Sequence, residues 1–133
     1  MARKFMFKGK SIEELRTLTI EEFMVLIDSR KRRALRRAGP KIKMLLEKIA
    51  HAKKMIAAGK DKTVKTQTRE AVILPDWVGM KFGIHNGKEF KPILIREEMV
   101  GRRLGEFAHT TGRVLHSGPG VGATRGSKFI PLK

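Results

Sequence analysis

Residues 80–95 read MKFGIHNGKEFKPILI, two runs rich in apolar residues that meet at Asn86-Gly87. An Asn-Gly pair between such runs is the strongest short-range signal for a β-hairpin, because both residues tolerate a positive φ. We therefore predict one strand over 80–85, a second over 88–95, and a tight turn at Asn86-Gly87.

The segments around this hairpin extend the same pattern. Pro92 lacks the N–H that a central strand needs, so we expect the second strand to have a free edge or a bulge there. Upstream, the apolar run 71–74 ends at Pro75 and indicates a short buried strand. Downstream, residues 97–107 favour a short helical turn with four side chains facing inward: Met99, Val100, Leu104 and Phe107.

Residues 1–59 carry the signals of amphipathic helices. Ser11 and Thr19 each precede a glutamate by three positions, the capping-box pattern that satisfies free N–H groups at a helix start. Gly39-Pro40 ends one helix and begins the next, and Gly59 ends that one. The apolar residues at helical spacing are Ile20, Phe23, Met24, Ile27, Ala34, Leu35 and Ala38 before Gly39, and Ile42, Leu45, Leu46, Ile49, Ala52 and Ile56 after Pro40.

These patterns predict a single α+β domain with appendages, in keeping with a chain of 133 residues. We expect a small mixed or antiparallel sheet with a hairpin, packed against helices. A basic helical region over 1–59 precedes the α+β core, which spans 60–111 and begins with a polar linker or exposed strand at 60–67. The last part, 112–133, is glycine-rich without apolar periodicity, which indicates an extended basic tail that becomes ordered against a partner.

Positive charge is concentrated in one part of the chain. Of the net +17, residues 30–69 contribute +13, with fifteen Lys or Arg against two acids, whereas 1–29 and 70–108 each balance to zero. Such a field repels itself unless a polyanion lies against it, so we expect a nucleic-acid partner. Arginine suits phosphate because its planar fork matches the oxygens. The densest cluster is Arg30, Lys31, Arg32, Arg33, Arg36, Arg37, Lys41 and Lys43, and Lys53, Lys54, Lys60, Lys62, Lys65 and Arg69 extend it.

Several classes of site are not expected. The absence of cysteine removes disulfides and thiolate metal sites, and suits a reducing cytosol. The four histidines show no metal-site spacing, and we interpret the glutamates at 97, 98 and 106 as capping or pairing with nearby arginines. The glycine-rich run at 118–128 lacks the spacing of a phosphate-binding loop. No apolar run approaches the ~20 residues that span a bilayer, and the basic N-terminus has no signal-peptide pattern. We therefore expect that the chain is not an enzyme and that it binds no metal, cofactor or membrane.

Longer motifs carry a family resemblance. The most specific pair is HNGK at 85–88 followed by EMVGRRLGEF at 98–107, and it resembles the universal small-ribosomal-subunit protein nineteen family. The SRKRR block at 29–33 is similar to the archaeal and eukaryotic branch, and the short N-terminus looks archaeal. Further matching segments are KTQTR at 65–69, ILP at 73–75, VG at 78–79, GPGVGAT at 118–124 and FIPLK at 129–133.

That resemblance implies a non-enzymatic structural component of the cytoplasmic small ribosomal subunit. It implies binding to small-subunit rRNA in the head, beside small-subunit protein thirteen, and a C-terminal tail that reaches toward tRNA near the decoding site. The implied rRNA-facing residues are Lys65, Thr66, Arg69, Lys88, Arg102 and Arg103, and the implied tail residues near tRNA or mRNA are Arg113, His116, Arg125 and Lys128.

Two other classes of function remain open at this point. A free-standing DNA-compacting protein would carry a similar charge, and equal affinity for duplex DNA and rRNA fragments would favour it. An RNA-processing enzyme would need a convergent acid, base or metal cluster. RNA turnover by the pure protein, abolished by Glu98→Gln or Glu106→Gln, would favour that class.

Overall fold

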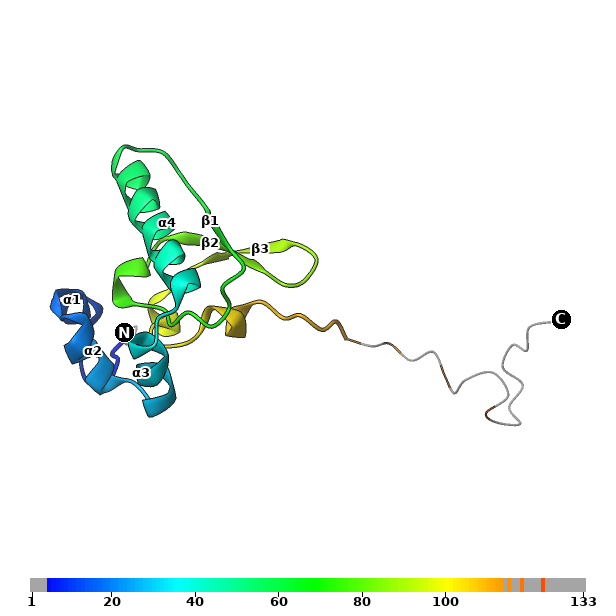
Figure 1. Ribbon diagram of the computed structural model, residues 1–133, viewed down its shortest axis with the longest axis horizontal. Helices are drawn as coiled ribbons and strands as arrows, with labels where there is room; N and C mark the ends of the chain where they lie inside the picture. Colours follow the sequence, from blue (N-terminus) through cyan, green and yellow to red (C-terminus); the bar gives the residue numbers. More distant parts are fainter. Residues whose placement is uncertain (1–4, 114, 116–117, 119–122, 124–133) are drawn as a thin grey trace, which may run out of the picture.

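The computed structural model describes residues 5–113, 115, 118 and 123, and Figure 1 shows its layout. A three-stranded sheet forms its centre, in the order β1-β2-β3. β1 (Val64–Thr66) runs parallel to β2 (Lys81–His85), and β2 pairs antiparallel with β3 (Phe90–Leu94). The sheet is mixed and helices pack against it, so the predicted α+β class is confirmed.

Among the described residues, four helices precede the sheet, and three of them begin at the predicted signals at Ser11, Thr19 and Pro40. Both capping boxes form: the Ser11 and Thr19 hydroxyls accept from the N–H three residues on, and the glutamate there accepts from the cap N–H. The N–H of Thr19 lowers the pKa of the Glu22 carboxyl, so this contact is complete near neutral pH and is lost on strong acidification. The helices are α1 (Ile12–Thr17), α2 (Ile20–Leu26), α3 (Ser29–Arg36) and α4 (Pro40–Ala57).

The apolar spacing over 20–38 predicted helical structure that runs on to Gly39, but the chain breaks between α2 and α3. Ile27 is extended there and 5% exposed, because it joins a small cluster of buried side chains. Asp28 then begins α3. The break is stable because the Arg32 side chain satisfies the carbonyl groups at the end of α2.

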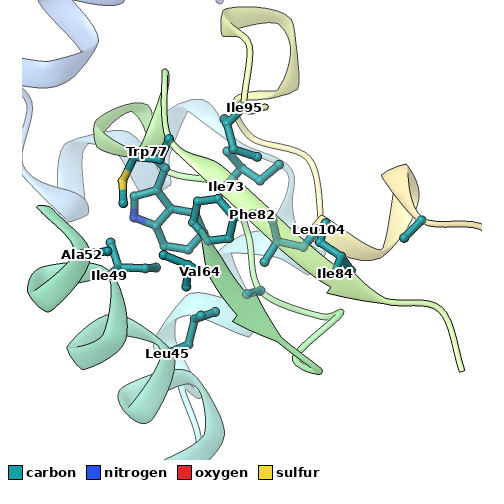
Figure 2. Close-up of a cluster of buried hydrophobic side chains, with 13 residues drawn as sticks. Leu45, Ile49, Ala52, Val64, Ile73, Trp77, Phe82, Ile84, Ile95 and Leu104 are labelled. Atoms are coloured by element: carbon teal, nitrogen blue, oxygen red, sulfur yellow. The ribbon is translucent and has the colours of Figure 1, made fainter. Parts of the chain in front are cut away.

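The main core lies between α4 and the sheet (Figure 2). Leu45, Ile49 and Ala52 form the buried stripe of α4, and Trp77 stacks on Phe82 with ring centroids 5.5 Å apart. The buried stripe is narrower than the sequence pattern predicted: Leu46 and Ile56, which share the apolar spacing, are 40% and 41% exposed.

The strand predicted over 71–74 is wrong, although the segment is buried. Val72 forms only an isolated bridge with Arg103, and the N–H of Ile73 donates to the Arg102 carbonyl at 2.8 Å. The facing chain is made of short 3-10 turns, η2 (Glu97–Met99) and η3 (Leu104–Phe107), so it cannot continue a straight ladder. The predicted helical turn is thus present as two shorter ones. Pro75 opens a further turn, η1 (Pro75–Trp77), after the buried run.

The hairpin is confirmed, but its loop is longer than predicted. His85 pairs with Phe90, which leaves four residues in the loop instead of two. The reason is the Asn86 side chain, whose Oδ1 accepts from the N–H groups of Lys88 and Glu89 at 3.0 and 2.9 Å. Pro92 lies in β3, at the edge of the sheet as expected.

A second, smaller core joins α1 and α2 to the rest of the protein. Leu15, Phe23, Ile27 and Val100 form it, and half-buried side chains at 74 and 78 pack against both cores. α1 to α3 therefore lie together beside the start of α4 (Figure 1) and are held there by apolar contacts as well as by chain connection.

Gly101 provides a test of this junction. Its φ of 76° suits glycine, and a Cβ there would lie 2.9 Å from Cζ of Phe7. We expect Gly101→Ala to lower the free energy of unfolding by roughly 1–3 kcal/mol, measured by urea denaturation. Gly112→Ala is the control, because none of the described residues has an atom within 4 Å of a Cβ placed there. Equal stability of the two variants would contradict the packing described.

Candidate nucleic-acid interface

α3 presents its cations on an open surface, and none of its side chains is buried. Arg30, Arg33 and Arg37, which helical spacing places on one face, line one hollow of roughly 500 Å³. Arg103, from the loop that follows Gly101, lines the same hollow. Four guanidinium-bearing side chains thus meet there from distant parts of the chain, with Glu70 as the only acid among the lining residues. The hollow offers a site for a dense group of anions.

The neighbouring cations of α3 divide into free and engaged groups. Arg36 lines a smaller hollow with Arg33 and Arg37. Lys31 pairs with Asp28 at 3.2 Å between Nζ and Oδ2, and the Asp28 side chain remains 71% exposed. The Lys31 side chain is 23% exposed, and a pair with so exposed a carboxylate contributes little stability, so an approaching phosphate can compete for Lys31.

Arg32 differs from the rest of α3. Its Nε donates to the Met24 carbonyl at 2.8 Å, and its Nη2 donates to the Ile27 carbonyl at 3.2 Å. These groups lie at the end of α2, where helix carbonyls lack partners within the helix. Arg32 therefore caps α2, although the sequence grouped it with the phosphate-binding candidates.

Arg69 is also occupied by the protein itself. Its Nη1 donates to the His85 carbonyl at 2.7 Å, and its Nη2 donates to the Gly105 carbonyl at 2.8 Å and to the Ala108 carbonyl. The absence of a side chain at Gly105 makes room, since a Cβ there would lie 3.0 Å from Arg69 Cβ. The guanidinium joins the end of β2 to η3. Thr66, a further implied contact, is 5% exposed, and its hydroxyl accepts from the N–H of Thr68.

The remaining candidates are exposed, and they are spread over several places on the surface. Lys41 and Lys65 line a second hollow between α4 and the sheet, together with Lys48 and Phe90. Sequence reasoning did not single out the last two; the pairing of Phe90 with His85 places the Phe90 side chain on the face opposite the buried Phe82. Lys43 on α4, Lys88 in the hairpin loop and Arg102 after Gly101 are exposed.

Of the four tail candidates, one lies within the described residues. Arg113 is exposed, whereas His116, Arg125 and Lys128 lie outside the described residues. Among the described residues, no three His, Cys, Asp or Glu side chains group as metal ligands. No helix in that part of the chain has the length and apolar character to cross a membrane.

Comparison with known proteins adds independent information. Residues 33–116 match the family described as ribosomal protein S19. The small ribosomal subunit protein uS19 of Methanococcus maripaludis strain S2 is 48% identical over 132 residues, which is 98% of this chain and 82% of the relative. The protein of the same name from strain C5 is 46% identical over the same shares.

The geometry of Arg69 leads to a stability prediction. Arg69→Gln removes charged donors from three carbonyl groups, so we expect the free energy of unfolding to fall by roughly 2–4 kcal/mol. Arg102→Gln removes the same charge from an exposed side chain and is expected to change it by no more than about 0.5 kcal/mol. Urea denaturation followed by circular dichroism measures both. A loss no larger for Arg69→Gln than for Arg102→Gln would refute the structural role.

Proposed function

We propose, because the chain belongs to the ribosomal protein S19 family, that it is a non-enzymatic structural component of the small ribosomal subunit that binds rRNA. The relatives are archaeal proteins of that subunit, which assigns this chain to the cytoplasmic ribosome. Its contribution is to neutralise rRNA phosphates where backbone segments converge. Double-stranded RNA offers shape, phosphates and 2′-hydroxyls more than readable base edges, so most contacts are independent of sequence.

The observation that carries this proposal is the hollow shared by Arg30, Arg33, Arg37 and Arg103. Like charges gathered on one open surface repel each other, and a lone protein gains nothing from the arrangement. Phosphate groups relieve the repulsion, and a phosphate can accept a bidentate pair of hydrogen bonds from a guanidinium. Because the four residues come from α3 and from the distant loop at 103, folding itself creates the site.

The residues predicted to contact rRNA have two different roles in this proposal. The side chains of Arg32, Thr66 and Arg69 hold the protein's own backbone, so we assign them to shaping the interface. The residues proposed to meet rRNA phosphates are Arg30, Lys31, Arg33, Arg36, Arg37, Lys41, Lys43, Lys65, Lys88, Arg102 and Arg103.

Three finer features complete the proposal and rest on family membership. The site of binding is the rRNA of the subunit head, and small-subunit protein thirteen lies beside the chain. The tail, 112–133, reaches toward tRNA and mRNA near the decoding site through Arg113, His116, Arg125 and Lys128. The region 1–59 serves as a basic extension of the rRNA-binding core over 60–111, with α4 shared between them through its buried stripe.

The number of phosphates contacted determines how steeply the affinity for rRNA falls as the salt concentration rises. With six to ten contacts, affinity for a transcript of the rRNA head falls by about 10³–10⁵ between 50 and 200 mM salt. Filter binding or fluorescence anisotropy measures this slope. A nearly flat profile would contradict the phosphate contacts, and equal affinity for duplex DNA would favour a general compacting protein instead.

The arginine hollow is tested by charge removal. The triple variant Arg30→Gln, Arg33→Gln and Arg37→Gln is expected to weaken rRNA binding by at least about tenfold, because three phosphate contacts are lost. The control removes three charges at the far end of α4 and beyond it: Lys53→Gln, Lys54→Gln and Lys60→Gln.

Circular dichroism distinguishes binding from folding in this experiment. The triple arginine variant is expected to keep the wild-type spectrum, since none of the three side chains is buried. An equal loss of affinity in both triple variants would mean that total charge, and not the hollow, determines binding.

A further inference from the structure

A second hollow lies where α4 meets the end of β1 and the start of β3, and phosphate binding alone does not explain the aromatic ring in its lining. Three lysines line it, Lys41 and Lys48 from α4 and Lys65 from β1. The apolar lining includes Met44, which is 58% exposed, and Phe90, which is 37% exposed. No acid is among the lining residues, so the hollow combines positive charge with an accessible aromatic surface.

The register of the sheet explains how Phe90 reaches this place. Paired residues point to the same side of a sheet, and the pairing puts Lys65 with Gly83 and Phe90 with His85 on the side opposite the buried Phe82. Gly83 has no side chain between its neighbours. A Cβ there would lie 3.3 Å from Lys65 Cγ and 3.5 Å from Phe90 Cβ. The glycine therefore lets Phe90 and Lys65 close over β2.

Two neighbours hold the Phe90 ring in place. The His85 ring meets it edge to face, with centroids 4.9 Å apart and planes at 66°. Lys65 Nζ lies 5.8 Å from the ring centroid. An aromatic ring that is positioned in advance loses little conformational freedom when a flat ligand stacks on it.

A partly exposed phenylalanine is by itself ordinary on a protein surface. Phe90 differs because three lysines line the hollow beside it and because polar side chains line the same hollow. Gln67 and Thr68 line the same hollow and offer hydrogen-bonding groups at its edge. Aromatic stacking, cations for phosphate and polar groups for a base edge are together the features by which proteins hold unpaired nucleotides.

We propose that this hollow binds one unpaired nucleotide of RNA, with its base stacked on Phe90 and its flanking phosphates paired with Lys41, Lys48 and Lys65. The proposal rests on the rRNA-binding function proposed above. It adds a local contact to an unstacked base, whereas the arginine hollow on α3 contacts phosphates alone. The two hollows can therefore be tested separately.

The test uses the full chain and a transcript of the small-subunit rRNA head. Base stacking on an aromatic side chain contributes roughly 1–3 kcal/mol, so Phe90→Leu is expected to weaken binding by about 5- to 150-fold. Phe90→Trp keeps a stacking surface and is expected to stay within about threefold of wild type. Leu94→Ala is the matched control: Leu94 is an exposed apolar residue of the same strand, 48% exposed and outside the hollow. It is expected to leave affinity within about twofold of wild type, because no stacking surface is lost.

A fluorescence measurement covers the case in which Phe90→Leu fails to fold. The wild-type chain has one tryptophan, Trp77, which is 3% exposed and stacked in the core. The indole introduced by Phe90→Trp is exposed, and RNA is expected to quench its emission while wild-type emission changes little. A fully paired RNA duplex without unpaired nucleotides is expected to give no such quenching.

The outcomes separate this inference from the general function. The nucleotide site is overturned if Phe90→Leu binds the transcript like wild type, or if the transcript does not quench the emission of Phe90→Trp. In that case the salt profile and the α3 triple variant still test the rRNA-binding function. Equal quenching by the paired duplex also overturns it. If the wild-type chain does not bind the transcript at all, both proposals fail.

Discussion

The burial of a narrow stripe of α4 against the sheet is the constraint on which the other features depend. Leu45, Ile49 and Ala52 remove one side of the helix from water, and the remaining sides stay open. The helix therefore gains its stability from a few apolar contacts and leaves its lysines free to face a partner. The same packing brings the start of α4 beside α3 and the end of β1, where the two basic hollows form.

Arginine serves two different purposes within this small protein. Arg32 and Arg69 donate to backbone carbonyl groups and hold α2, β2 and η3 in place. Arg30 and Arg103 line an open hollow instead. The difference does not lie in the side chain. It lies in whether unpaired carbonyl oxygens are within reach, since a guanidinium donates to any fixed acceptor that the fold presents.

The side chains that hold the fold together and the exposed cations are different sets of residues in this protein. Two small cores carry the fold, one between α4 and the sheet and one around Phe23. Neither core uses the exposed cations, so a substitution on the basic surface affects binding more than stability. In isolation the net charge of +17 opposes compaction. Under the function proposed above, rRNA phosphates offset this repulsion and turn the same charge into a source of affinity.

Local patterns alone were sufficient for the helix starts, the hairpin, the α+β class and the basic character of the partner surface, because caps, turn residues and net charge act over a few positions. The four-residue loop, the break before α3 and the bridge at Val72 depended on partners far along the chain. The same holds for the site: helical spacing places Arg30 beside Arg33, but only the tertiary fold brought Arg103 into their hollow and turned Arg69 toward backbone carbonyl groups. Whether two side chains share a hollow or a hydrogen bond depends on how close they lie in space. The sequence determines that distance only indirectly, through the packing of the core.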